Sequence, residues 1–219
     1  MKVTLLAHTP EPEKVCAAAA RSCYSGDGAS DLLERKDPAG FLAKVVGMGH
    51  ESVIEHAVFT FSVEGVSRSL THQLVRHRVA SFSQQSQRYV SLETPTYVTP
   101  ETVKADEKKT EIYEAAMDKA WAAYNSLIEL GIPPEDARYA LPNGCTTNIT
   151  ITMNARELRH FFELRCCNRA QWEIREMADK MLELCQEVSP AIFANAGASC
   201  VRGPCPEGAK CCGHPRRKQ

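Results

Sequence analysis

The sequence predicts an α+β (mixed α/β) protein in which an antiparallel-rich sheet is flanked by long helices within a single compact domain. Two segments, 57–64 and 146–153, alternate apolar and polar residues with the period of a half-buried strand. Two longer segments, about 101–130 and 170–188, carry apolar residues at helical spacing. A chain of 219 residues is long enough to bury one sizeable core.

The N-terminal part of the chain predicts one strand and two helices. The strand covers 2–7. The segment Pro10-Glu11-Pro12 suits the start of a helix that continues through the alanine run at 17–20, because proline is tolerated in the first helical turn. A second helix is expected over 38–47, where a glycine ends it.

The strand at 57–64 leads into a short helix. Phe59 and Phe61 fall on one face of the strand, and polar residues fall on the other. Apolar residues then recur every four positions as far as Leu74, which predicts a helix that runs directly into Arg76. Side chains in the loop after such a helix are well placed to converge on a ligand.

The helix expected over 101–130 has an apolar stripe that includes Met117 and Tyr124, and Gly131 suits its C-terminal cap. A stripe of this kind is far more often core or subunit interface than a cofactor site.

The last two helices follow the strand at 146–153. Asn154 is a good N-cap, and Glu157 stands three residues later in the manner of a capping box. This helix reaches about residue 165, and the helix at 170–188 is ended by Pro190.

The composition is that of an ordinary soluble globular protein. The chain has 26 Lys+Arg and 27 Asp+Glu, so its charge argues against a nucleic-acid-binding domain. No apolar stretch approaches the ~20 residues of a membrane helix, and residues 1–7 are too short for a signal peptide. We therefore expect a cytoplasmic protein, in which the ten cysteines do not form a disulfide framework.

The most informative segment is the run Arg76-His77-Arg78-Val79-Ala80-Ser81-Phe82-Ser83-Gln84-Gln85-Ser86-Gln87-Arg88-Tyr89. Guanidiniums present forks of N–H donors that match phosphate oxygens, and amides and hydroxyls read the edges of bases and sugars. By composition alone, a small-anion site and a solvated basic surface are equally good interpretations of this run.

Two further segments concentrate polar chemistry. Gly49-His50-Glu51-Ser52-Val53-Ile54-Glu55-His56 carries two imidazoles and two carboxylates, but its histidines are not at a helical metal-ligand spacing. Asn154–Arg165 places four basic side chains on one short helix, where a charged solvent face is the plain alternative.

These three segments, taken together and in order, resemble the flavin-dependent thymidylate synthases. The family carries R-H-R-x-x-S-x-x-x-x-S-x-R, G-H-E-S-x-x-E-H, and N-A-R-x-L-x-x-F-x-x-L-R followed by A-Q-W-E-I, and all are present within about 45–180. No G-x-G-x-x-G sequence follows a strand, so a Rossmann flavin site is not indicated.

The resemblance implies a set of site residues. The residues that would hold FAD are Ser52, Arg76, His77, Arg78, Gln84, Asn154, Arg156 and His160, with His50 beside the pocket. The residues that would surround dUMP are Gln73, Arg76, Gln84, Gln85, Ser86, Gln87, Arg88, Arg138 and Arg165. The chain departs from some members at position 84, which is Gln here and Glu there, and at position 160, which is His here and Asn there.

The resemblance also implies the reaction. The family methylates dUMP to dTMP with a carbon from methylenetetrahydrofolate and a reducing equivalent from FAD that NADPH has reduced. Arg165 would activate the uracil ring, because a fixed cation stabilises the charge that develops there. Ser86 is read as a dUMP ligand, since nothing near it in sequence activates it as a nucleophile. The resemblance implies a homotetramer with shared active sites. It implies no nucleic-acid partner and no membrane partner.

Two other functions remain as alternatives. One is a nucleic-acid-binding module that uses the basic segments Arg76–Arg88 and Arg156–Arg165. The other is a metal-binding or redox module in the C-terminal tail.

The tail at 200–219 is expected to be separate from the synthase domain at 1–199. Its candidate zinc ligands are Cys200, Cys205, Cys211, Cys212 and His214. The spacing lacks a C-x2-C pair, so a local disulfide or a flexible thiol-rich tail is an equal alternative. We expect the tail to lie outside the three site motifs, so that truncation after Ser199 leaves flavin binding intact.

Overall fold

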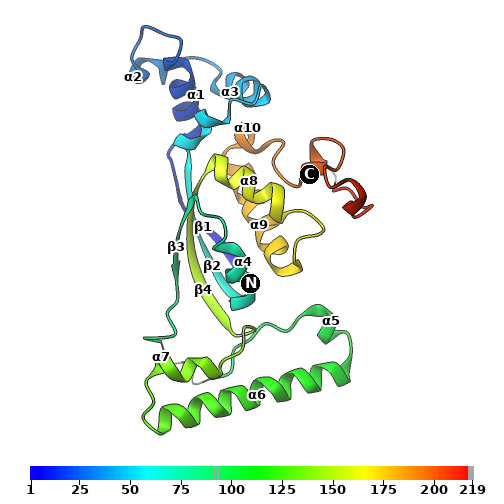
Figure 1. Cartoon of the computed structure of the whole chain (residues 1–219). Helices are drawn as coiled ribbons and strands as arrows, with labels where there is room; N and C mark the ends of the chain where they lie inside the picture. Colours follow the sequence, from blue (N-terminus) through cyan, green and yellow to red (C-terminus); the bar gives the residue numbers. More distant parts are fainter. Residues whose placement is uncertain (91, 93, 217–219) are drawn as a thin grey trace. The chain divides into compact units, whose positions relative to one another are not determined.

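The computed structural model describes residues 1–90, 92 and 94–216, and it is built from one sheet and a set of helices (Figure 1). The strands are β1 (Lys2–His8), β2 (Val58–Ser67), β3 (Ala80–Gln84) and β4 (Thr146–Asn154), in the sheet order β1-β2-β4-β3. Alternation along β2 buries Phe59, Phe61 and Val63, as the sequence predicts.

Two side-chain contacts show that β2 and β4 are antiparallel. The hydroxyls of Thr60 and Thr152 lie 3.0 Å apart, and the Gly65 N–H donates to Oδ1 of Asn148 at 3.1 Å. The partner in β4 therefore moves backwards as β2 advances. The expectation of an α+β fold with an antiparallel sheet is confirmed.

The helices are α1 (Pro12–Ser22), α2 (Ala29–Leu32), α3 (Pro38–Gly47), α4 (Arg68–Leu74), α5 (Glu101–Lys104), α6 (Glu107–Glu129), α7 (Pro134–Ala137), α8 (Ala155–Arg165), α9 (Trp172–Val188) and α10 (Pro190–Phe193). Short 3-10 turns are η1 (Glu51–His56), η2 (Arg138–Ala140), η3 (Ser199–Val201) and η4 (Gly208–Lys210). Of the described helices, none combines the length and the apolar character that crossing a membrane requires.

The structure differs from the sequence pattern in two of the expected segments, and it adds the short helices α2, α7 and α10, which were not expected. The single helix expected over 101–130 is two helices, because the Asp106 side chain accepts a hydrogen bond from the Lys109 N–H at 3.0 Å and so starts α6 anew. The run after Arg76, expected as a loop, contains β3. Its alternation consists mostly of polar residues, so the apolar period that marks a strand is absent.

Two compact units can be distinguished in the chain. The first contains residues 1–2, 63–76 and 83–149, and the second contains residues 3–62, 77–82 and 150–216. The predicted boundary after residue 199 is not a boundary between these units, since the tail belongs to the second unit.

The first unit has a small aromatic core under α6. Met117, Trp121 and Cys145 are buried there, and Tyr97, Tyr113 and Leu141 pack against them. The indole N–H of Trp121 donates to the Leu92 carbonyl at 2.9 Å, so the polar end of this buried ring is satisfied.

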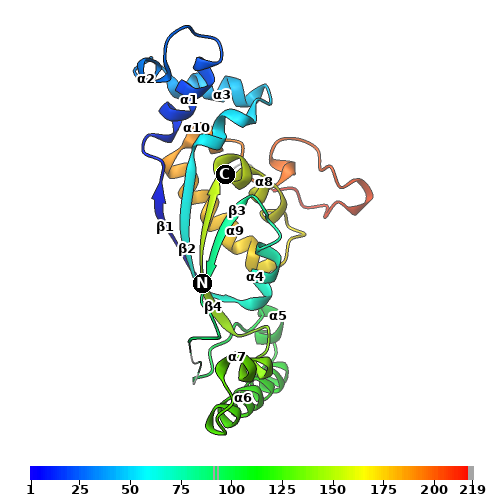
Figure 2. The same cartoon turned by 60° about the vertical axis from the view of Figure 1, so that its left-hand side comes forward.

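The second unit has a larger core, in which α8 and α9 lie against the sheet (Figures 1 and 2). Phe59 of β2 meets Phe193 of α10 edge to face at 5.4 Å between ring centroids. Phe162 of α8 also reaches Phe193, at 6.1 Å. This packing fixes α8, the helix that carries two of the predicted flavin residues, Arg156 and His160.

We predict that Trp121→Ala lowers the free energy of unfolding by about 3–5 kcal/mol, because it removes a fully buried indole and leaves a cavity. Chemical denaturation followed by circular dichroism measures this change. The matched control is Ile112→Ala on the same helix, where the side chain is 65% exposed and the change is expected to be within about 0.5 kcal/mol. Equal losses in the two variants would contradict this description of the core.

Candidate functional site

The site begins at the end of α4, which leads into the run Arg76–Tyr89, here named the Arg76 motif. The Ser67 hydroxyl caps this helix by accepting a hydrogen bond from the Leu70 N–H at 3.1 Å. Beyond the helix, the exposed Arg76 and Arg78 flank His77, which is only 5% exposed. The motif therefore turns one imidazole into the protein and leaves the guanidiniums on either side at the surface.

His77 joins Glu157 and Arg165 into one hydrogen-bonded chain. Its Nδ1 lies 3.1 Å from the Glu157 carboxylate, and the Nε–H of Arg165 donates to its Nε2 at 3.0 Å. Because Nε2 must accept from a guanidinium, the proton of the neutral ring sits on Nδ1 and is donated to Glu157. All three side chains belong to the second unit.

The surroundings of His77 favour this neutral form. Burial lowers the pKa of the imidazole below its ordinary value of 6.5, and the charge of Arg165 lowers it further against the opposing effect of Glu157. Burial also lowers the pKa of Arg165, although a guanidinium stays charged at neutral pH. The hydrogen-bonded series Glu157–His77–Arg165 therefore ends in the cation of Arg165, which the neutral imidazole of His77 orients.

The exposed face of α8 forms one wall of a cavity of about 420 Å³, which we name the α8 cavity. Its lining includes Asn154, Arg156 and His160, all of them predicted flavin residues. Asn154 caps the helix, since its Oδ1 accepts from the Glu157 N–H at 2.9 Å. The volume falls in the range of small-molecule sites, about 300–1,000 Å³.

The carboxylates of the α8 cavity are each held by a basic side chain. Arg156 contacts Glu55, and Arg159 donates through Nε to Glu51 at 3.2 Å. Arg159 is itself buried, and its Nη1 also donates to the Ile192 carbonyl at 2.7 Å. The cavity is therefore polar, and its guanidinium, imidazole and amide donors lie beside carboxylates that are paired with basic side chains.

The second half of the Arg76 motif is organised within the first unit. Gln84 donates to the hydroxyls of Thr71 and Thr147 at 3.1 and 3.3 Å. Gln87 donates to Sγ of Cys145 at 3.2 Å, and burial raises the pKa of that thiol. The amide side chains are thus fixed by the sheet and by the core.

The hydroxyl and guanidinium of this segment are also engaged. The Ser86 hydroxyl accepts from the Arg88 backbone N–H at 3.2 Å, which supports a structural role in the loop. Both Nε and Nη2 of Arg88 lie 2.8 Å from one carboxylate oxygen of Glu135 on α7. An anion that binds Arg88 must therefore share this guanidinium with Glu135 or displace the Glu135 carboxylate.

Gln87 and Arg138 line a cavity of about 230 Å³, which we name the Arg138 cavity. Arg68 lines it too, and its Nη2 donates to the Gln85 carbonyl at 2.8 Å. Burial lowers the pKa of Arg68, and the nearby charge of Arg138 adds to this effect. Within the described part of the chain, the buried Nε of Arg68 lacks a hydrogen-bond partner. Two guanidiniums, with no carboxylate among the described residues that line it, make this cavity suited to an anion.

The two predicted residue sets separate between the units. The dUMP set lies in the first unit except for Arg165, and the FAD set lies in the second unit except for Arg76 and Gln84. His50 and Ser52 stand at the exposed start of η1.

The C-terminal tail departs from the expectation that it lies apart from the site motifs. Arg202 lines the α8 cavity, and Cys200 and Cys205 line a cavity of about 270 Å³ together with Arg165. All ten cysteines are free thiols. In the described residues, no three side chains of His, Cys, Asp or Glu are grouped so as to hold a metal ion.

Sequence reasoning missed the residues that hold the predicted site residues in place. They are Arg68, Glu135 and Cys145. Arg159 and Arg202, which line the α8 cavity beside the predicted flavin residues, were not predicted as site residues either. The sequence pattern assigns Glu157 only to a helix cap, whereas its carboxylate holds His77. The partners lie far apart in sequence, so no local pattern reveals them. The one available signal is that buried charges require partners.

Comparison with known proteins gives consistent results. The family model described as thymidylate synthase complementing protein matches residues 4–191. A flavin-dependent thymidylate synthase of Geobacter sulfurreducens is 53% identical over 97% of this chain and 94% of its own length. Those of Clostridium tetani and Pyrococcus furiosus are 50% and 45% identical, over 97% and 94% of this chain and 93% and 90% of their own lengths.

The fold is also found in a solved structure. It is a UMP/dUMP methylase, PolB, from Streptomyces cacaoi bound with 5-Br dUMP, with a TM-score of 0.79. It is 24% identical, and the alignment covers 88% of this chain and 92% of that chain. At this identity the likeness concerns the architecture.

We predict that the His77 ring remains neutral, with its proton on Nδ1, at any pH above 6.5, which is the ordinary pKa of an imidazole. Its lowered pKa contributes stability that is fully present above pH 6.5 and is lost as the pH falls through the pKa of the folded state. Nitrogen NMR of the ring reports the tautomer. The free energy of unfolding between pH 7.5 and 5.5 should fall more steeply in the wild type than in His77→Gln.

The control for this prediction is His56→Gln, which removes an exposed imidazole from the same unit. Its pH dependence should follow that of the wild type. A ring protonated on Nε2 at neutral pH, or parallel pH profiles for the wild type and His77→Gln, would contradict the hydrogen-bonding scheme.

Proposed function

Because the chain belongs to the thymidylate synthase complementing protein family, we propose that it is a flavin-dependent thymidylate synthase that methylates dUMP to dTMP. The carrying observation in the structure is that two predicted dUMP residues, Gln87 and Arg138, line an anion-suited cavity, and that predicted FAD residues line a polar cavity of about 420 Å³. The relatives favour this enzyme over a nucleic-acid-binding module.

The Arg138 cavity supports binding of the dUMP phosphate. Its two guanidiniums, from Arg68 and Arg138, offer forks that match phosphate oxygens. Gln87 adds an amide to the same lining, and Arg88 stands next to it in sequence. We assign dUMP binding to the dUMP set named above, with the phosphate held by the arginines.

The α8 cavity fits a flavin dinucleotide in the chemistry of its donors. A capped helix N-terminus and the guanidinium of Arg156 favour an anionic group, and His160 and Asn154 offer further hydrogen bonds. FAD, when bound, supplies the redox chemistry of the methylation. This chain's contribution is to bind and orient it through the FAD set named above.

Arg165 is the residue that we propose for activation of the pyrimidine. Methylation at C5 needs electron density on the ring, and a fixed cation at the ring's polar edge stabilises the charge that develops. His77 and Glu157 hold this guanidinium in one orientation. We therefore infer that His77 acts by positioning Arg165 as well as by any contact with FAD.

The finer features of the reaction are part of the same proposal. Methylenetetrahydrofolate supplies the carbon, and NADPH reduces the flavin. The enzyme works as a homotetramer with shared active sites, in the cytoplasm. The family resemblance supports these features.

The proposal is tested with purified protein and dUMP that carries tritium at C5. Tritium should be released, and dTMP formed, only when the flavin, a reductant and methylenetetrahydrofolate are all present. Turnover that persists after complete removal of the flavin would overturn the proposed function.

We predict that Arg165→Ala lowers kcat at saturating dUMP by roughly 10²-fold or more, as for the loss of other preorganised donors. Arg165→Lys should recover only part of the rate, since an ammonium is a point charge without the planar fork. Steady-state kinetics with a dUMP binding titration separates rate from affinity. A wild-type kcat in Arg165→Ala would refute the role.

We predict that Glu135→Gln strengthens dUMP binding by about two- to fivefold, because the phosphate no longer competes with a carboxylate for Arg88. The gain should shrink at high salt, which screens this exposed pair. Asp136→Asn on the same short helix is the matched control and should leave affinity unchanged. Equal affinities for dUMP in the wild type and Glu135→Gln would show that the pair does not compete with the substrate.

A further inference from the structure

The tail begins by binding the same face of α8 that lines the α8 cavity. The Ser199 hydroxyl donates to Oε1 of Glu163 at 2.8 Å, and Nη2 of Arg202 lies 2.9 Å from Oε2. One oxygen of this carboxylate thus holds Ser199, the last residue before the tail, and the other holds Arg202 within the tail. Burial alone would raise the pKa of Glu163, but these two partners lower it, so the carboxylate is ionised where it holds them.

Helical geometry places this contact beside the predicted flavin residues. Arg156, His160 and Glu163 are spaced at i, i+4 and i+7, so they lie along one face over about two turns. Arg202 lines the α8 cavity with them, although it lies beyond the segment 4–191 that the family model matches. The cavity is therefore completed by a residue that the family motifs do not include.

The guanidinium of Arg202 retains donors for a ligand. Besides the contact with Glu163, its Nη1 donates to the Asn195 carbonyl at 3.3 Å. A guanidinium carries five N–H donors, so these two contacts leave others available. The side chain is 32% exposed, which places it at the cavity surface.

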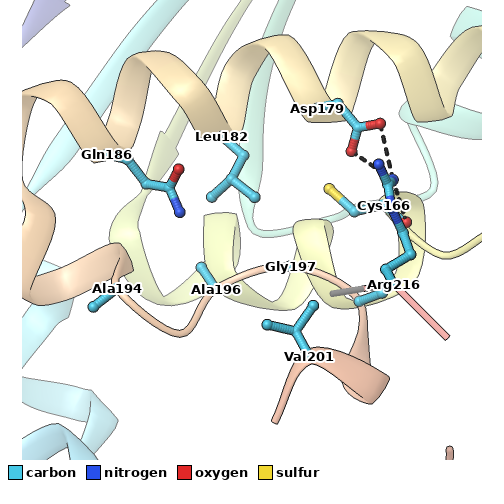
Figure 3. Close-up of a pocket in the computed structure, with 10 residues that line it drawn as sticks. Cys166, Asp179, Leu182, Gln186, Ala194, Ala196, Gly197, Val201 and Arg216 are labelled. Atoms are coloured by element: carbon cyan, nitrogen blue, oxygen red, sulfur yellow. Dashed lines mark hydrogen bonds and ion pairs between the residues drawn. The ribbon is translucent and has the colours of Figure 1, made fainter. Parts of the chain in front are cut away.

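The rest of the tail is anchored independently of Arg202. Nη1 of Arg169 donates to the Lys210 carbonyl at 2.7 Å and lies 3.3 Å from the Glu207 carboxylate. Arg216 makes a forked contact with Asp179 of α9 at 2.7 and 2.8 Å and also donates to the Cys166 carbonyl (Figure 3). Replacement of Arg202 should therefore leave the tail docked.

Resting on the proposed flavin site in the α8 cavity, we propose that Arg202 is a cofactor-binding residue that donates hydrogen bonds to an oxygen of the flavin dinucleotide. The tail is then part of the cofactor site. This replaces the expectation that truncation after Ser199 leaves flavin binding intact.

The test is the dissociation constant of the full-length protein for FAD, measured by quenching of flavin fluorescence. Arg202→Ala should weaken binding about tenfold, as for a charge-assisted hydrogen bond. Arg202→Lys should weaken it less, because the charge remains. Circular dichroism confirms that each variant is folded.

Two further variants separate this role from simpler ones. Arg169→Ala removes a tail anchor that does not line the α8 cavity, and it should leave FAD binding unchanged. The double variant Glu163→Gln/Arg202→Ala also removes the negative charge that Arg202 neutralises. If Arg202 contacts FAD directly, FAD binding by this double variant should remain weak.

The outcomes that would overturn the proposal are distinct. Wild-type affinity in Arg202→Ala would show that Arg202 makes no contact. Equal weakening in Arg169→Ala would reduce the effect to tail docking, and recovery in the double variant would reduce it to neutralisation of Glu163. In all three cases the proposed function stands. Failure of the wild type to bind FAD would overturn the proposed function as well.

Discussion

The hydrogen-bonded chain Glu157–His77–Arg165 is the interaction on which the rest of the site depends. It joins the Arg76 motif to both ends of α8, because Glu157 lies in the first turn of that helix and Arg165 in the last. Burial and the neighbouring guanidinium keep the imidazole neutral, and that state lets Nε2 accept from Arg165. A protonated ring would have no acceptor to offer, and the guanidinium would lose its orientation.

Helix α8 is consequently the main scaffold of the second unit. Its buried face packs Phe161 and Phe162 into the core, and its exposed face lines the α8 cavity. Buried Arg159 ties it to η1 and α10 through Glu51 and the Ile192 carbonyl. A site built on a helix that is packed on one face and paired on the other is held more precisely than one built on loops. The tail extends this scaffold through the contact of Arg202 with Glu163.

The sequence predicts the elements whose apolar residues recur at a regular period. It does not predict the elements in which polar site residues stand at those positions. The helix at 38–47 and the cap at Asn154 are found as expected, because both depend on local residues. Strand β3 was not expected, since its residues are mostly polar. The carboxylate partners of Arg88 and Arg202 were also not expected. Each lies 39 or more residues from its arginine, and such pairs are fixed by tertiary packing.

The most direct test of the central claim is the rate of the chemical step in Glu157→Gln, measured in a single turnover at saturating dUMP. The variant removes the negative charge that accepts the hydrogen bond from Nδ1–H of His77 while leaving Arg165 in place. If the chain orients Arg165, the rate should fall by roughly tenfold or more while the affinity for dUMP changes little. A wild-type rate in Glu157→Gln would contradict the account.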